Sequence, residues 1–279
     1  MIKKVLLIVF IVSLFNFLSA DYIEDKLSQM LEENANGYLQ PLANTMGAGL
    51  NSGYFNTAKV LKTLRPSVMI GAAFIPIPSN EKKFNAITPT STVETSTIFG
   101  NNGNNGFPEG TDLNIAAVPT VSFSLGLPKG NEIMLRGFPP IKITDDIGNI
   151  SLWGVGFKHS IDQYLTKLFP IDWSIQAVYQ QLTVGDIVDV NTLAFNMQAS
   201  KKLLFLTPYC ALGYEKAQLK AKYTYDDGLI QEEIKLKLDA ENDIKATVGL
   251  RYSILILDIF ADYSLANTST FNIGVGASF

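Results

Sequence analysis

The residues able to act as nucleophiles, general bases or metal ligands are few in this chain. It has 279 residues but one histidine, His159, and one cysteine, Cys210. Ser160 follows His159 directly, and a serine with a histidine is the combination that many hydrolases use to activate a nucleophile. The alternating pattern around them predicts an extended strand, in which neighbouring side chains point to opposite faces. His159 therefore cannot serve as a base for Ser160, and we expect no enzymatic activity.

Metal and cofactor chemistry also lacks support. One histidine and one cysteine supply too few nitrogen and sulfur ligands for a typical structural metal site. The Asn/Gly run at 101–106 lacks the strand-to-helix context in which a glycine-rich loop binds phosphate. The net charge of −4, with no basic stripe, argues against a nucleic-acid partner. We predict no metal and no cofactor, and interpret one acidic cluster as a solvated loop: Asp226, Asp227, Glu232 and Glu233.

Two alternating segments near the end of the chain carry charges on one face only. The first turns Lys245 and Arg251 away from its apolar side chains, and the second does the same with Asp258 and Asp262. A Lys or Arg facing lipid at the bilayer midplane costs about 2–4 kcal/mol. This alternation therefore indicates that the charged side chains face the inside of a barrel. We interpret these lumen charges as ion pairs that stiffen the wall. A constriction that selects polar solutes is the alternative.

Residues 269–279 show the same alternation most clearly. One face is small or polar, and the other consists of Phe271, Ile273, Val275, Ala277 and Phe279. This pattern resembles the closing strand of Gram-negative outer-membrane β-barrels, whose final Phe is part of the signal read by the assembly machinery. We therefore expect that machinery, through Phe279, and outer-membrane lipid as partners.

The N-terminus has the features of a secretory signal peptide. A basic start at Lys3 and Lys4 precedes an apolar run over 5–15, and Ala20 stands before the polar Asp21. The run is about half of the roughly 20 residues that a membrane-spanning helix needs. We predict a signal peptide over 1–20, cleaved between Ala20 and Asp21, and a protein exported to the bacterial outer membrane.

The rest of the composition and pattern fits an all-β membrane protein. Charged residues make up only 17% of the chain, and the mean hydropathy is +0.17. About ten alternating segments follow residue 65, interrupted by a long polar loop over 78–110. We predict an antiparallel transmembrane β-barrel of about 10–12 strands over 65–279, with 14 strands as an alternative. Whether the hairpin over 229–238 spans the membrane decides the number.

Aromatic residues are placed as membrane girdles require. Trp173, Tyr252 and Phe279 fall near the strand ends expected in the periplasm, and Tyr263 and Phe271 fall near the external ends.

The segment before the barrel, 21–64, is predicted to contain a helix and a plug. Apolar residues at helical spacing over 22–34 indicate an amphipathic helix that Asp21 could cap. The following stretch is rich in Gly, Asn and Ser, which suits a segment that is threaded closely past other backbone and satisfies its own polar groups with side chains. The plug candidates are Tyr38, Pro41, Asn51, Ser52, Tyr54, Asn56 and Lys59.

Two stretches carry a family resemblance. They are Y-L-Q-P-L-A … G-A-G-L-N-S-G-Y-F-N-T-A-K within 38–59, and G-V-G-F-K-H-S-I with F-P-I-D-W-S within 154–174. Both resemble an uncharacterised family of outer-membrane barrel proteins, itself distantly similar to the long-chain fatty-acid transporter (FadL-like) barrels. The resemblance implies an outer-membrane location and an N-terminal hatch inside the lumen, but no specific activity.

Our leading functional expectation is a monomeric outer-membrane barrel for the passive passage of a small solute, a hydrophobic one included. The alternative is a filled, non-conducting barrel that acts as a structural or assembly partner. A third possibility, a soluble β-sandwich in the periplasm, would bury one face of each strand.

Overall fold

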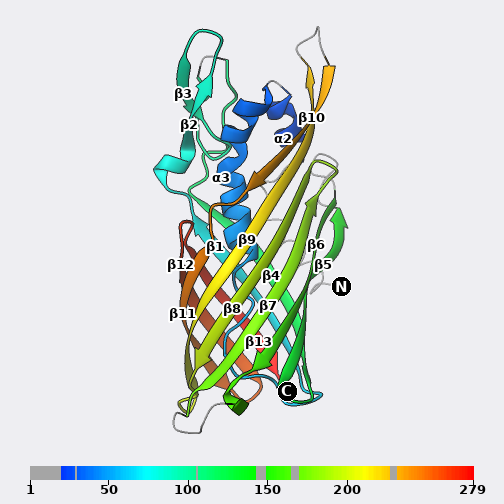
Figure 1. Cartoon of the computed structure of the whole chain (residues 1–279), viewed down its shortest axis with the longest axis vertical. Helices are drawn as coiled ribbons and strands as arrows, with labels where there is room; N and C mark the ends of the chain where they lie inside the picture. The colour runs from blue at the N-terminus through cyan, green and yellow to red at the C-terminus, as the bar shows by residue number, and fades with distance from the viewer. Residues whose placement is uncertain (1–19, 29, 105, 143–148, 165–169, 227–230) are drawn as a thin grey trace.

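Ten antiparallel strands form the wall of a closed barrel in the part of the chain that the structure describes (Figure 1). The computed structural model describes residues 20–279 except 29, 105, 143–148, 165–169 and 227–230. The wall strands are β1 (Pro66–Pro76), β4 (Ile115–Leu127), β5 (Asn131–Lys142), β6 (Asn149–Ser160), β7 (Asp172–Val184), β8 (Val188–Ser200), β9 (Leu206–Asp226), β11 (Ile244–Ile254), β12 (Leu257–Leu265) and β13 (Thr270–Ser278).

Strand pairing closes the barrel without a free edge at its base. β13 pairs with both β12 and β1, and β9 pairs with both β8 and β11. The extra strand β10 (Gln231–Asp239) pairs only with the far half of β9, over 218–226, and forms a hairpin beyond the ring. The strand number is therefore ten, the lower bound of the prediction. The 14-strand alternative and the β-sandwich alternative are wrong.

The two ends of the barrel differ. At the C-terminal end, short turns join the strands and β1 starts beside the end of β13. At the opposite, loop end, β9 and β10 extend outward and the connection from β1 to β4 forms a lobe. This connection was predicted as a plain loop. It contains a 3₁₀ turn, η1 (Ser79–Lys82), and a two-stranded sheet of β2 (Lys83–Ile87) and β3 (Thr92–Ser96).

Among the residues that the structure describes, two helices and not one precede the barrel. α2 (Ala20–Leu27) and α3 (Glu32–Leu50) lie at the loop end, and α3 descends into the lumen (Figure 1). The predicted single helix over 22–34 is thus wrong, and Asp21 lies inside α2, not at its cap. Neither helix is long and apolar enough to cross a membrane. The predicted signal peptide lies outside the described residues except for Ala20.

The helix α3 also continues well past residue 34, where the predicted helix ended, and through the first plug candidates. Pro41 lies inside it. A proline removes one helical N–H and crowds the carbonyl four residues earlier, which here belongs to Gly37. Burial against the wall compensates, because every residue from Pro41 to Leu50 is buried. Tertiary packing has overridden a weak local propensity.

Small residues let α3 lie against the wall on two sides. A Cβ placed on Gly47 would lie 2.8 Å from Ala217 Cβ of β9, and one on Gly49 would lie 2.6 Å from Val118 Cγ2 of β4. Leu39, Leu42 and other apolar residues of α3 belong to one buried cluster with the inward side chains of β1, β4, β6, β7, β8 and β9. The upper lumen is therefore a packed core.

The outer face of the barrel is an apolar belt. The side chains predicted to face lipid are exposed along the strands, for example Phe123, Trp153, Phe195 and Ile273, while their neighbours in sequence are buried. The belt confirms the predicted phase of these strands, and it is the surface expected of a barrel that contacts lipid.

We expect Gly49→Val to destabilise the plugged barrel by roughly 1–3 kcal/mol, because the added carbons overlap Val118 and Ile75 in a packed core. The measurement is urea unfolding in detergent micelles, followed by tryptophan fluorescence. Glu33→Val is the control, since it places the same β-branched side chain on an exposed position of α3. Equal losses in both variants would show that helix propensity, and not the close approach to the wall, sets the effect.

Candidate functional site

The lumen below α3 is occupied by the segment 51–65, whose backbone is held by side chains of the wall. Gln180 Nε2 donates to the Leu50 carbonyl at 2.7 Å, and Arg136 Nη2 donates to the Ser52 carbonyl at 2.6 Å. Lys245 donates to the Asn51 carbonyl. Lower down, Lys158 Nζ donates to the Thr57 carbonyl at 2.7 Å. Each donor comes from a different strand, so the wall holds this segment from several sides.

The charge of these donors matches the end of α3. The last carbonyls of a helix have no partner within it, and they carry the negative end of the helix dipole. Lys245 and Arg136 meet this end inside the barrel, where both side chains are almost fully buried. Wall cations therefore replace the capping residues that a soluble helix would use.

Tyr54 lies at the centre of this arrangement. Its ring is 5.7 Å from the Arg136 guanidinium and 5.6 Å from Lys245 Nζ, both within cation–π range. Its hydroxyl is hydrogen bonded to Asn196 of β8. Phe55 packs edge-on against Tyr54 and Tyr209, and these rings with Met134 and Val178 form a second buried cluster. Aromatic side chains thus fill the middle of the lumen.

Three of the four predicted lumen charges, Lys245, Asp258 and Asp262, are buried and Arg251 is half-buried, but they pair only in part as expected. Arg251 contacts Asp258 at 2.7 Å, as the neighbouring strands suggested. Lys245 does not form an ion pair with Asp262. It pairs with Glu215 of β9 at 2.5 Å, and both side chains are nearly inaccessible. Asp262 instead accepts hydrogen bonds from Tyr209 at 2.9 Å and Asn272 at 2.6 Å.

Glu215 of β9 is a lumen residue that we did not predict. Side chains alternate along β9, and the inward Thr207 places Glu215 inward too. Extending this alternation along the strand would have found it. Gln180 and Lys158 also face inward, and both hold the plug.

Most plug candidates contact the wall or the loops. Tyr38 donates from its hydroxyl to the Glu109 carbonyl at the loop end. Ser52 Oγ is 2.9 Å from Thr270 Oγ1, and Asn56 accepts from Arg251 Nη1 at 3.1 Å. Asn51 is the C-cap of α3, and Pro41 lies inside it. Lys59 is exposed at the C-terminal end.

Contacts at the loop end fix the start of the plug. Tyr223, on the part of β9 beyond the ring, donates from its hydroxyl to the Met30 carbonyl at 2.9 Å. Burial, with the nearby carboxylate of Glu32, raises the pKa of Tyr223 to about 12. The phenol therefore stays protonated and remains a donor at neutral pH.

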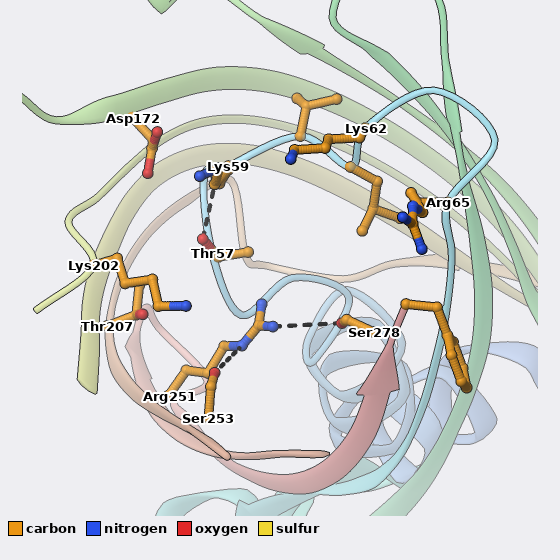
Figure 2. Close-up of a pocket in the computed structure, with 13 residues that line it drawn as sticks. Thr57, Lys59, Lys62, Arg65, Asp172, Lys202, Thr207, Arg251, Ser253 and Ser278 are labelled. Atoms are coloured by element: carbon orange, nitrogen blue, oxygen red, sulfur yellow. Dashed lines mark hydrogen bonds between the residues drawn. The ribbon is translucent and has the colours of Figure 1, made fainter. Parts of the chain in front are cut away.

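A pocket of about 380 Å³ opens where the plug leaves the lumen, at the C-terminal end. Figure 2 shows its side chains coming from two sources: the crossing segment 57–65, and the ends of the wall strands. Most of its charged side chains are cationic: Lys59, Lys62, Arg65, Lys202 and Arg251, with Asp172 the carboxylate among the lining side chains.

The wall has one seam where pairing stops. β4 and β5 pair from Leu127 and Asn131 only as far as Ser122 and Arg136. Above this point β4 pairs with β1 alone, and β5 pairs with β6 alone across a bulge between Phe138 and Ile141. The bulge falls at Pro139 and Pro140, which lack the N–H that a ladder hydrogen bond needs, and the strand continues beyond it to Lys142.

A second pocket, of about 560 Å³, lies at this seam on the outer surface. It is lined by lipid-facing side chains such as Val121, Leu135 and Trp153, and also by Ser122 and Arg136, which face the lumen. The side-chain nitrogens Nε and Nη1 of Arg136 have no hydrogen-bond partner among the described residues. The seam thus brings a polar interior group next to an apolar outer surface.

The remaining predicted residues lie on the outer face. Tyr252 and Phe279 are exposed at the C-terminal end with Trp173 half-buried near them, and Tyr263 pairs with Phe271 toward the other end. His159 is 2.7 Å from Asn131 Oδ1 and 3.2 Å from the Tyr164 hydroxyl. Within the described residues, no group of three His, Cys, Asp or Glu side chains is placed to hold a metal ion.

We expect Lys245→Met to cost about 3–5 kcal/mol of stability, because it leaves Glu215 buried without its cation and the Asn51 carbonyl without its donor. Unfolding in urea, measured by tryptophan fluorescence, tests this. The control is Lys216→Met, which removes an exposed ion pair with Asp243 and should cost much less, because solvent screens that pair. Similar losses for the two lysines would contradict a holding role for Lys245.

Comparison with solved structures finds other barrels at low similarity. A designed transmembrane β-barrel is 11% identical with a TM-score of 0.29, over 79% of this chain and 99% of that one. Ail, the attachment invasion locus protein of Yersinia pestis, is 12% identical with a TM-score of 0.28, over 78% and 99%. The KdgM porin is 13% identical with a TM-score of 0.29, over 58% and 91%. Likenesses this distant carry no weight for function, and the barrel rests on its own strand pairing.

No curated protein matches the chain. A family model described as a family of unknown function (DUF6588) matches residues 1–279. Because the match spans the whole sequence, the resemblance to an uncharacterised family is confirmed, and the protein belongs to this family of unknown function, DUF6588.

Proposed function

We propose that this protein is a monomeric bacterial outer-membrane barrel that passes a small hydrophobic or amphiphilic solute through the side of its wall. The observation that carries the proposal is the seam between β4 and β5, with its apolar outer pocket. In a bilayer core, unpaired backbone groups cost several kcal/mol each, so barrels close their hydrogen-bond ladders. Unpaired strand backbone within the apolar belt therefore costs free energy, and we infer that this stretch has a function.

The position of the seam along the barrel supports its contact with lipid. Ala117 of β4 pairs with Phe74 of β1, which pairs with the exposed Phe271 of β13. The open part of β4 therefore lies within the apolar belt. Prolines at 119, 139 and 140 lack an N–H, which suits edges that have lost a neighbour.

The orientation follows from the ends of the barrel. Outer-membrane barrels with an even number of strands keep short turns in the periplasm and long loops outside. The C-terminal end then faces the periplasm, and α2, β10 and the lobe of β2 and β3 face the exterior. The hatch-like plug is the feature on which we base the proposed likeness to fatty-acid transporter barrels.

The filled lumen favours a lateral route over an axial one. The apolar core around α3 fills the upper half, and Tyr54, Phe55 and Tyr209 fill the middle. A solute at the seam meets apolar side chains first, and the unpartnered nitrogens Nε and Nη1 of Arg136 lie buried directly behind them, so a local side-chain movement would bring the solute to the guanidinium. The chemistry fits an amphiphile with an acidic group, because a guanidinium binds carboxylate with two parallel hydrogen bonds.

We expect Val121→Trp to slow the uptake of N-phenyl-1-naphthylamine several-fold, because the indole fills the seam pocket. The measurement is fluorescence uptake by Gram-negative cells carrying the protein in a lipopolysaccharide-containing outer membrane, which resists hydrophobic solutes. Val248→Trp is the control, as Val248 is exposed on β11 away from the seam. Uptake that is unchanged by Val121→Trp, or slowed equally by Val248→Trp, would contradict a route at the seam.

A filled barrel with a structural role is the second candidate. The observation in its favour is the set of wall donors that bind the plug backbone at successive heights: Gln180, Lys245, Arg136 and Lys158. Such a barrel would conduct nothing and would present its loop end to a partner.

Conductance in planar bilayers separates an axial pore from a filled barrel. We expect the intact protein to show no steady ion current, because side chains and the plug occupy the lumen. We expect a form lacking residues 21–59 to conduct, because α2, α3 and the upper part of the crossing segment are then gone. Steady current through the intact protein would contradict the filled lumen, and a silent truncated form would show that the wall side chains alone close it.

A further inference from the structure

The pocket at the C-terminal end has a charge pattern that no contact within the described chain uses. Lys59, Lys62, Arg65 and Lys202 line it, and none of them has an ion-pair partner among the described residues. Asp172, half-buried at the start of β7, is the carboxylate among the lining side chains. Like charges gathered around one cavity repel one another, so the cluster favours an anion between them.

Arg251 is a different kind of cation in the same pocket. Its guanidinium is fixed by Asp258 at 2.7 Å, by Ser253 at 3.1 Å and by Asn56 at 3.1 Å. Asp258 also accepts from the hydroxyls of Ser253 and Ser278. Figure 2 shows the Arg251 guanidinium beside Ser253 and Ser278 in this network. The lysines and Arg65 therefore share the pocket with a preformed polar network.

We propose that this pocket binds a phosphate-bearing anion, which bridges the plug segment and the barrel wall. A phosphate oxyanion is matched by several ammonium and guanidinium donors at once, whereas a single carboxylate is satisfied by one arginine. The volume of about 380 Å³ holds a phosphate with a short organic group, such as glycerol phosphate. The ligand source is either a soluble organophosphate or the headgroup of an anionic phospholipid.

The bridging geometry has a consequence for the plug. Lys59, Lys62 and Arg65 belong to the crossing segment, and Lys202 belongs to the turn before β9. An anion shared between these two sides links the end of the plug to the wall. Ligand binding then stabilises the plugged state, because a ligand that binds one state shifts the equilibrium toward it. This inference does not depend on transport through the seam.

The experiment titrates the full-length protein in non-ionic detergent with sn-glycerol 3-phosphate, by isothermal calorimetry at low salt. We expect saturable binding that weakens as salt is added. In Lys62→Gln/Lys202→Gln, which removes one free cation from each side, we expect the Kd to rise roughly tenfold or more. The matched control is Lys220→Gln/Lys237→Gln, which makes the same charge change on the β9–β10 hairpin and should leave the Kd unchanged.

A second experiment distinguishes a soluble organophosphate from a phospholipid headgroup as the ligand. The protein is placed in nanodiscs of phosphatidylcholine, alone or with a third of phosphatidylglycerol, and the titration is repeated. Weaker apparent binding only in the phosphatidylglycerol discs means that the headgroup competes for the pocket; equal binding in both assigns the pocket to a soluble organophosphate. The proposal is overturned when glycerol phosphate does not bind wild type, or when pocket and hairpin variants bind it equally well.

Discussion

The structure depends on how the end of α3 is satisfied inside the barrel. The carbonyls of Leu50, Asn51 and Ser52 end a helix in a lumen whose space is taken by side chains, with Lys245 and Arg136 as their charged donors. Hydrogen bonds to charged groups contribute about 1.5–3 kcal/mol each, so the three charged donors Lys245, Arg136 and Lys158 together contribute roughly 4.5–9 kcal/mol. This is comparable to the whole stability of a typical domain. The plug is therefore part of the fold.

The same contacts explain why the wall can be polar inside and remain stable. Buried charges cost free energy unless they are paired and hydrogen bonded. Lys245 is paired with Glu215, and its ammonium also donates a hydrogen bond to the Asn51 carbonyl. Arg251 is neutralised by Asp258 and also reaches Asn56. Wall and plug thus satisfy each other, and removing either one leaves unpaired groups in the other.

Alternation in the sequence was enough to predict the wall but not the plug. A strand shows its two faces directly, so the lipid-facing set that includes Phe123, Trp153 and Ile273 could be predicted. The helix beyond Pro41 could not, because its local propensity is poor and the barrel supplies its stability. The partner of Lys245 was missed because pairing depends on which strands are neighbours and on their register, and the long β9 contacts three strands at once.

The seam and the plug together limit how a solute could pass. An axial path requires the plug to leave, which breaks contacts worth roughly as much as the fold itself and exposes Arg136, Lys158 and Lys245. A lateral path requires only that a solute enter where β4 and β5 are already unpaired. The difference in free energy favours entry from the side. An anion in the basic pocket would link the crossing segment to the wall. It would therefore raise the free energy of the axial path further above that of the lateral path through the seam.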